Sequence, residues 1–98
     1  VFGHVDGVCT ITEIAELDGC QRWLLKAPKE LIKYIAKKGS VSLSGVSLTV
    51  NSVSDYVFSI NLIPFTLSHT TLKYNKAGDK LNIEIDMLAR YVESINKK

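Results

Sequence analysis

The chain has 98 residues, of which 46% are hydrophobic and 22% are charged. These values are typical of one globular domain with a single small core. A net charge of +2 spread over scattered lysines argues against nucleic acid, and no run of about 18 apolar residues is present that could span a membrane.

The chain starts with VFGHVDG, without Met and without the charged and apolar segments of a signal peptide. We therefore expect a fragment or a processed chain. Cys9 and Cys20 are expected to be free thiols in a reducing, cytoplasmic setting, because two cysteines without an export signal favour that compartment. Neither cysteine has another Cys or His at metal-ligand spacing, so no metal site is predicted.

The first part of the chain predicts a hairpin followed by a helix. Residues 5–16 are rich in β-branched side chains and lead to Asp18-Gly19, a pair that suits a tight turn because glycine tolerates positive φ. Residues 21–27 form the expected return strand. Pro28 suits the first position of a helix, and a glycine suits its end. The apolar stripe and the basic end of this helix are expected at Leu31, Ile32, Ile35, Lys37, Lys38 and Gly39.

The rest of the chain predicts four more strands, at residues 40–43, 46–53, 57–63 and 80–86. Residues 54–56 and 77–79 are expected to be tight connections. Pro64 is expected to end a strand, and residues 66–72 to form a short helical turn. Asp86 can act as the N-cap of a last helix at residues 87–96. The apolar residues of that helix recur at helical spacing: Met87, Leu88, Tyr91, Val92 and Ile95.

Six strands, short helices and no βαβ spacing predict an all-β fold, a small closed antiparallel barrel of Greek-key type. One short helix would lie between the second and third strands, and a C-terminal helix would follow the last strand. Closure would remove the exposed edges that a domain of this size could not otherwise protect. We expect the barrel to occupy residues 1–86 and the C-terminal helix residues 87–98.

The stretch KGSVSLSGVSLTVN, residues 38–51, is the most informative part of the chain. Two alternating runs meet at Ser44-Gly45, and Ser47 and Thr49 follow two residues apart. A period of two places these hydroxyls on one face of a strand and Val46, Leu48 and Val50 on the other. Inside a barrel, that spacing would point two hydroxyls at one ligand.

Five motifs in order resemble the C-terminal barrel of the riboflavin synthase family, over nearly the whole chain. They are Gly3-His4-Val5-Asp6-Gly7, Lys38-Gly39-Ser40, Gly45-Val46-Ser47-Leu48-Thr49-Val50, Ile63-Pro64 with Thr66, and Asn82-Ile83-Glu84-Ile85-Asp86 running into Leu88-Ala89-Arg90-Tyr91. Each motif alone is weak, but their order and spacing together are specific.

The resemblance implies a fold, a reaction and partners. Members of the family have two related barrels and a helix that helps to build a homotrimer. They convert two molecules of 6,7-dimethyl-8-ribityllumazine into riboflavin and 5-amino-6-ribitylaminouracil by moving a four-carbon unit, without a metal or a cofactor. The active site forms between this barrel and the N-terminal barrel of a neighbouring subunit. We expect this chain alone to be a half-site with little or no activity. An alternative is that two copies pair as a pseudo-symmetric homodimer.

The same resemblance implies which residues contact the ligand. A lumazine needs an apolar wall, backbone groups for its pyrimidine edge and short polar side chains for its ribityl tail. The implied binding positions are Gly3, His4, Val5, Lys38, Ser47, Leu48, Thr49, Leu62, Ile63, Pro64, Phe65 and Thr66. Leu62 and Ile63 would form the wall, and Lys38 would reach the tail.

The implied catalytic positions are His4, Ser47, Thr49 and Asp86. His4 has a suitable pKa to act as a general base or proton shuttle near neutral pH. Ser47 and Thr49 could orient the ligand or water, and Asp86 corresponds to a family carboxylate near the interface.

Simpler interpretations exist for each of these residues when the resemblance is set aside. His4 would be a histidine at a strand end, and Ser47 and Thr49 would be ordinary strand hydroxyls. Asp86 would be a helix N-cap, worth about 1 kcal/mol. Trp23 is expected to lie in the core rather than to stack on a ligand.

Three functions therefore stay open at this point. The chain could be half of a riboflavin synthase, a non-catalytic lumazine- or flavin-carrying barrel, or a structural barrel that supports oligomerisation through its last helix. The first is favoured, because carrier proteins of this fold use the first barrel for the chromophore, and this chain resembles the second.

Overall fold

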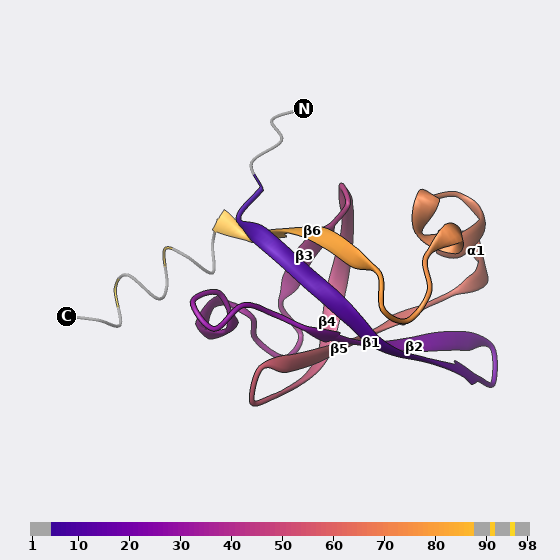
Figure 1. Cartoon of the computed structure of the whole chain (residues 1–98), viewed down its shortest axis with the longest axis horizontal. Coiled ribbons are helices and arrows are strands. Elements are labelled where there is room, and N and C mark those ends of the chain that lie inside the picture. Colours follow the sequence, from indigo (N-terminus) through magenta and orange to yellow (C-terminus); the bar gives the residue numbers. More distant parts are fainter. Residues whose placement is uncertain (1–4, 88–90, 92–94, 96–98) are drawn as a thin grey trace.

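The chain folds into a closed antiparallel barrel (Figure 1). The computed structural model describes residues 5–87, 91 and 95. The strands are β1 (Gly7–Leu17), β2 (Cys20–Lys26), β3 (Ser40–Leu43), β4 (Val46–Ser54), β5 (Val57–Leu62) and β6 (Lys80–Ile85). The short helices are η1 (Ile32–Tyr34), α1 (Pro64–Ser68) and η2 (Thr71–Tyr74). The predicted all-β barrel is confirmed.

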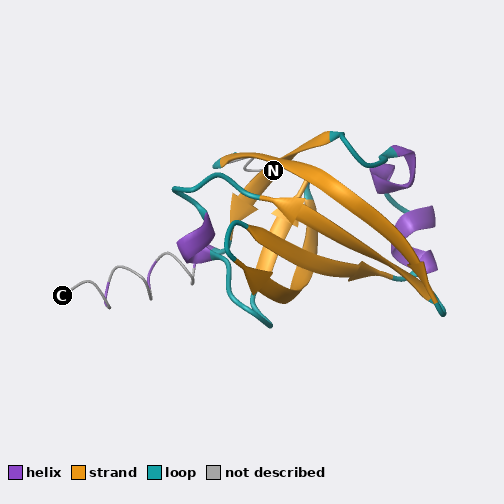
Figure 2. Ribbon diagram, turned by 60° about the horizontal axis from the view of Figure 1, so that its bottom comes forward, coloured by secondary structure: helices purple, strands orange, loops and turns teal. Residues whose placement is uncertain are grey.

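The strands follow one another around the barrel in the order β1-β2-β5-β4-β3-β6, and β6 closes the ring by pairing with β1. Gly7 lies opposite Ile83, and Thr10 lies opposite Lys80. The connection from β2 to β3 passes over one end of the barrel, and the connection from β5 to β6 covers the other. Figure 2 shows the helical segments at these two ends.

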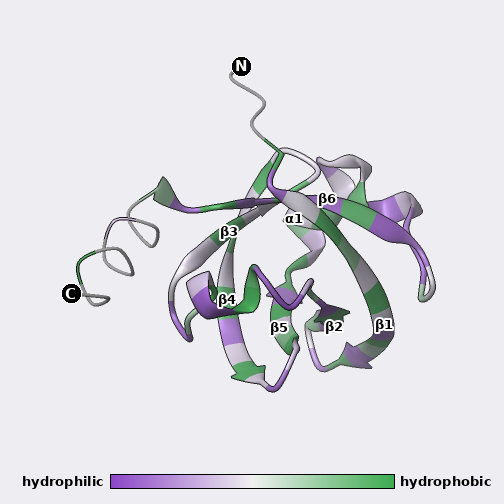
Figure 3. Ribbon diagram, turned by 60° about the vertical axis from the view of Figure 1, so that its left-hand side comes forward, coloured by the Kyte–Doolittle hydropathy of each residue, from purple (hydrophilic) through white to green (hydrophobic). Residues whose placement is uncertain are grey.

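Alternating side chains fill the interior. Figure 3 shows the resulting bands of hydrophobic and hydrophilic residues along the strands. Trp23, which was predicted to be a core residue, is buried between β1 and β5 on strand β2. The largest fully buried side chains besides it include Phe58, Ile11, Leu25, Leu43, Ile60, Leu62, Leu72 and Ile83. Burying a side chain of this size contributes roughly 1.5–3 kcal/mol, which makes this core the main source of stability.

The predicted turns are present. Gly19 and Gly45 have φ of +83° and +84°, in the region that glycine enters without steric cost. Gly7 lies close to Leu31, because a Cβ at this position would come within 2.8 Å of Leu31 Cδ1 and the leucine side chain would have to shift. This close approach lets Leu31 seal the end of the barrel.

The helix predicted from Pro28 to Gly39 is wrong in extent. Only η1 is helical, and the Pro28 carbonyl accepts from the N–H groups of Leu31 and Ile32 in the turn before it. A short helix has little stability of its own, so tertiary packing decides its shape. Here a tighter turn buries both Leu31 and Ile35 in the core. The left-handed residue near the end of this segment is Lys38, with φ of +70°, and not Gly39.

The segment after β5 also differs from the prediction. Strand β5 ends at Leu62, one residue earlier than predicted, and α1 begins at Pro64 instead of Thr66. Proline is well tolerated there, because the N–H group that it lacks would not form a hydrogen bond within the helix at the first helical position. A break at Thr70 separates α1 from η2, and the Thr70 hydroxyl accepts from Leu72 N at 3.2 Å.

The predicted C-terminal helix lies mostly outside the described residues. Met87, Tyr91 and Ile95 have helical backbone conformation, and their side chains are 73%, 65% and 48% exposed. The predicted positions Leu88 and Val92 are outside the described ranges. The N–H groups that Asp86 would cap, those of residues 88 and 89, are outside them too. Among the described residues, no helix has the length and apolar character needed to cross a membrane.

Replacing a core leucine should cost far more than replacing an exposed one. Leu25→Ala is expected to lower the free energy of unfolding by about 2–5 kcal/mol, because Leu25 is fully buried. Leu17→Ala removes the same atoms from a side chain that is 41% exposed, and we expect a loss of about 0.5 kcal/mol. Urea denaturation measures both. Similar losses in the two variants would contradict the assignment of the barrel interior.

Candidate functional site

The hydroxyls of Ser47 and Thr49 lie on the same face of β4, as their spacing predicts, but they point outwards. Both residues are exposed, whereas Val50 is buried and Leu48 packs against the core. The interior of a small barrel is filled by its own side chains, so no room for a ligand is left there. The candidate site is therefore on the outer wall.

A hollow of about 520 Å³ lies on that wall, and we call it the β4 groove. It lies within the size range of small-molecule sites. Its lining residues are Lys38, Ser47, Leu48, Thr49, Val50, Asn51, Asn61, Ile63 and Thr66. Six of the positions implied by the family resemblance thus meet at one place: Lys38, Ser47, Leu48, Thr49, Ile63 and Thr66.

Asn51 and Asn61 were missed by the sequence analysis. Asn51 lies at the irregularity where the pairing of β4 with β5 shifts between Val50 and Ser52. Asn61 interrupts the apolar strand β5 between two buried residues, Ile60 and Leu62. That polar interruption was the available signal, since alternation alone places Asn61 on the outer face.

Ile63 forms an apolar wall of the β4 groove and is 53% exposed. Leu62 was expected to share this role, but it is buried in the core. Neighbouring residues of an extended chain point to opposite sides, so the two could not both face the groove. Leu62 therefore does not line the β4 groove.

Helix α1 closes the groove with Thr66. The carbonyls of Phe65 and Thr66 already accept hydrogen bonds, from His69 N at 3.1 Å and from the Thr70 hydroxyl at 2.8 Å. Their N–H groups lie in the first helical turn and have no acceptor within this short helix. Phe65 is 64% exposed and stacks on His69, with ring centroids 3.9 Å apart. The backbone here can thus offer donors to a ligand.

Lys38 enters the groove from the segment before β3. Its left-handed backbone is held by two hydrogen bonds of 2.8 Å, from Lys38 N to the Val50 carbonyl and from Val50 N to the Gly39 carbonyl. A non-glycine residue in this conformation costs of order 1 kcal/mol and persists only where the surroundings fix it. The position of the Lys38 backbone relative to β4 is therefore well defined.

Asp86 lies in a neighbouring hollow of about 350 Å³ on the other side of Ser47. Ser42 of β3 lies opposite both Ser47 of β4 and Glu84 of β6, so one polar row crosses three strands. The hollow is lined by Ser40, Val41, Ser42, Ser47, Glu84, Ile85, Asp86 and Met87. Ser47 borders both hollows, which makes it the link between Asp86 and the β4 groove.

The remaining predicted positions lie elsewhere. Pro64 lines a third hollow, of about 490 Å³, near the β1–β2 turn together with Leu62 and Cys20. Gly3 and His4 are outside the described residues. Val5 is exposed and does not line the β4 groove. The next residue, Asp6, accepts from Ile85 N at 2.7 Å, which ties this segment to the end of β6.

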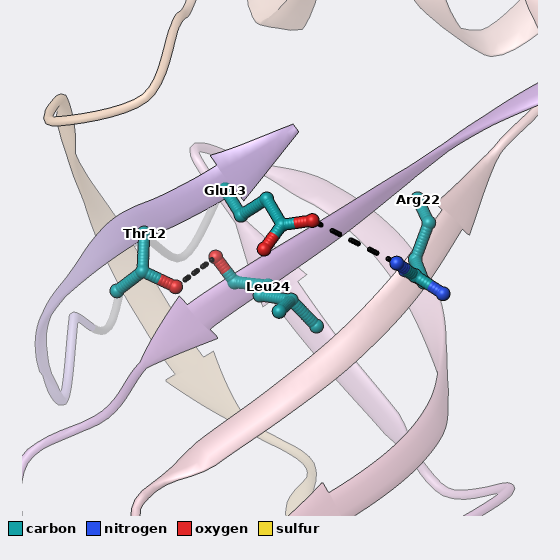
Figure 4. A network of polar contacts seen from close by, with 4 residues as sticks. All are labelled: Thr12, Glu13, Arg22 and Leu24. Atoms are coloured by element: carbon teal, nitrogen blue, oxygen red, sulfur yellow. Dashed lines mark hydrogen bonds and ion pairs between the residues drawn. The ribbon is translucent and has the colours of Figure 1, made fainter. Parts of the chain in front are cut away.

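Arg22 on β2 lies opposite Asn61, which lines the β4 groove. One of its guanidinium nitrogens is 3.7 Å from Glu13 Oε2, and its Nε is buried without a hydrogen-bond partner. Figure 4 shows this pair beside the hydrogen bond from the Thr12 hydroxyl to the Leu24 carbonyl, which is 3.2 Å long. Arg22 does not itself line the groove.

Both cysteines are free thiols, as predicted. Cys9 is fully buried between β1 and β6, and burial raises the pKa of its thiol to about 12. A thiol with so high a pKa is a poor nucleophile, because the thiolate is the reactive form. Cys9 is therefore a core residue and not part of a reactive site.

Comparison with protein families gives a match over residues 2–86 to the model of the lumazine binding domain. Riboflavin synthase of Brucella abortus is 54% identical over 91 residues, which are 93% of this chain and 45% of that protein. Riboflavin synthase of Photobacterium phosphoreum is 41% identical over 97% of this chain and 44% of its own length. The chain thus spans about half the length of the curated relatives it matches.

Solved structures of LumP have the same fold. LumP complexed with riboflavin superposes with a TM-score of 0.81 and 28% identity, over 88% of this chain and 47% of that chain. LumP complexed with flavin mononucleotide and LumP complexed with 6,7-dimethyl-8-(1'-D-ribityl) lumazine each give a TM-score of 0.82 at 28% identity.

The two thiols should differ in reactivity. At about pH 8, an alkylating reagent is expected to modify Cys20 in the native protein and to leave Cys9 unmodified, because Cys9 is buried with a raised pKa. Denaturant should expose both thiols. Mass spectrometry of the intact protein counts the modifications, and a Cys20→Ser variant is the control. Modification of that variant in its native state would contradict the position of Cys9.

Proposed function

The chain belongs to the lumazine-binding domain family, and we propose that it binds 6,7-dimethyl-8-ribityllumazine in the β4 groove as the C-terminal half of a riboflavin synthase. The observation that carries this proposal is the gathering of six implied binding residues around one hollow. These residues come from the segment before β3, from β4, from the segment that joins β5 to α1, and from α1 itself.

The chemistry of the β4 groove suits such a ligand. Ile63 offers an exposed apolar surface to a flat ring, and the N–H groups at the start of α1 can donate to its pyrimidine edge. The hydroxyls of Ser47 and Thr49 can bond the ribityl chain.

We assign the reaction to the whole protein and not to this chain alone. Two lumazines would lie face to face, one in the β4 groove and one in the N-terminal barrel of a neighbouring subunit. A proton leaves the C7 methyl group of one lumazine, and the resulting carbanion adds to C7 of the other. A four-carbon unit then moves between them, which yields riboflavin and 5-amino-6-ribitylaminouracil. Riboflavin, the product, would share the groove with the substrate.

Four residues are assigned to this turnover. His4 would accept or pass on the proton, and Ser47 and Thr49 would orient the ligand or a water molecule. Asp86 would place a carboxylate at the interface with the partner barrel. The hollow that holds Asp86 shares Ser47 with the β4 groove, which supports a joint role for these two residues.

Assembly would involve the C-terminal segment. Met87, Tyr91 and Ile95 recur every four residues of a helix, so their exposed side chains lie along one stripe. An apolar stripe of this kind is suited to contact other subunits. We propose that it supports a homotrimer of the full-length protein in the cytoplasm, with a dimer as the alternative for this chain alone.

A non-catalytic carrier is the second candidate. The similarity to LumP complexed with riboflavin, flavin mononucleotide and the lumazine favours it. The 54% identity to a riboflavin synthase, against 28% to LumP, favours the enzyme. Colour separates the two, because a carrier should purify with a bound yellow or fluorescent ligand and an enzyme half should be mostly empty.

Removing the two outer hydroxyls should weaken lumazine binding. Ser47→Ala with Thr49→Ala is expected to raise the Kd about tenfold or more, since each lost hydrogen bond costs about 0.5–1.5 kcal/mol. Fluorescence titration with 6,7-dimethyl-8-ribityllumazine measures the change. Ser54→Ala is the matched control, because Ser54 is exposed on the same strand but does not line the β4 groove. Equal affinities in all variants would contradict the assignment of the β4 groove as the lumazine-binding site.

The isolated chain should produce no riboflavin, because the reaction needs two lumazines held in position by two barrels. Chromatography of the titrated sample tests this, and robust turnover by the chain alone would refute it. In a full-length enzyme, His4→Ala is expected to lower kcat by about 100-fold or more. His69→Ala is the control that removes the other histidine, and an unchanged rate in the His4 variant would end the proposed role of His4.

A further inference from the structure

The β4 groove has an asymmetric distribution of charge. Among the described residues that line it, Lys38 is the one with a charged side chain, and its partners in the lining are hydroxyls, amides and apolar groups. No carboxylate of the described chain lines this groove. A ligand that carries negative charge would therefore meet a cation there without a nearby acidic competitor in the lining.

The groove also has two chemically different ends. Ile63 and Thr66 lie at the end where β5 leads into α1, whereas Lys38 is bonded to β4 at Val50, beside Asn51. Ser47 and Asn51 are four residues apart, which is about 13 Å along a strand. A flat ring suits the apolar end with its backbone donors, and a polar tail would then run along β4 towards the amides and Lys38.

The surrounding charges support this direction. Arg22 lies opposite Asn61, which lines the groove, and Glu13 partly balances the charge of Arg22 at 3.7 Å. The carboxylates of Glu84 and Asp86 lie in the other hollow, beyond Ser47. The tail of a ligand in the groove would thus point away from two carboxylates and towards a cation.

We propose that the β4 groove recognises a ribityl tail that ends in phosphate, with Lys38 as the cation that pairs with it, so that the chain binds flavin mononucleotide more tightly than riboflavin. This inference rests on the proposed lumazine-binding function and adds a ligand class to it. A phosphate at physiological pH is a stronger partner for an ammonium group than a neutral hydroxyl. The phosphorylated flavin would then compete with lumazine for the same groove.

A pair of titrations tests the proposal on the 98-residue chain. Riboflavin and flavin mononucleotide carry the same ring and the same ribityl chain, so the ratio of their Kd values reports the phosphate alone. We expect flavin mononucleotide to bind about three- to tenfold more tightly at low ionic strength. The preference should shrink in about 0.5 M salt, where screening is strong.

Substitutions then locate the effect. Lys38→Met should bring the ratio close to one, because methionine is unbranched like lysine and removes the charge. Lys38→Arg should restore the preference. Lys37→Met is the matched control, since Lys37 is the exposed neighbour, carries the same charge and does not line the groove. Displacement of bound lumazine by flavin mononucleotide confirms that both occupy one site.

Each outcome decides the proposal. Equal affinities, or a preference that survives Lys38→Met, would overturn it while lumazine binding continued to support the proposed function. Weaker binding of flavin mononucleotide than of riboflavin would place the tail near Glu84 and Asp86, and would also overturn it. Failure of all three ligands to bind would remove the proposed function as well.

Discussion

Closure of the barrel by the pairing of β1 with β6 is the constraint on which the rest of the structure depends. Once six strands form a ring, every second side chain must enter a narrow interior, and only apolar residues can do so without loss of hydrogen bonds. Polar residues of the strands are left on the outside. Any ligand chemistry of this chain is therefore confined to the outer wall and to the segments that cross the ends.

Local patterns account for most of the fold. Alternation located all the strands, and the turn glycines located the hairpins, because both features depend on residues close in sequence. The helix expected after Pro28 failed for the opposite reason. Its shape depends on how Leu31 approaches Gly7 and fills the end of the barrel, a contact between distant residues that no local period reveals.

The candidate site also contains residues that local spacing predicts and residues that only the strand order brings together. The shared face of Ser47 and Thr49 followed from their spacing, whereas Asn61 joins them only because β5 is the neighbour of β4 in the ring. Asn51 depends on an irregularity in the pairing of those strands. The separation of Asp86 from the groove likewise reflects the position of β6 beyond β3. The residues of each strand could be predicted from the sequence, but the order of the strands around the barrel could not.

The bond between Asp6 and Ile85 N places the beginning of β1 and the end of β6 side by side. Segments attached before and after the barrel would therefore leave from the same pole, next to the hollow that contains Asp86. The β1–β2 hairpin with Gly19 occupies the opposite pole (Figure 1). A fusion partner or surface linker at either terminus would crowd the acidic hollow, whereas a fluorescent tag or an immobilisation handle inserted at Gly19 would leave it accessible.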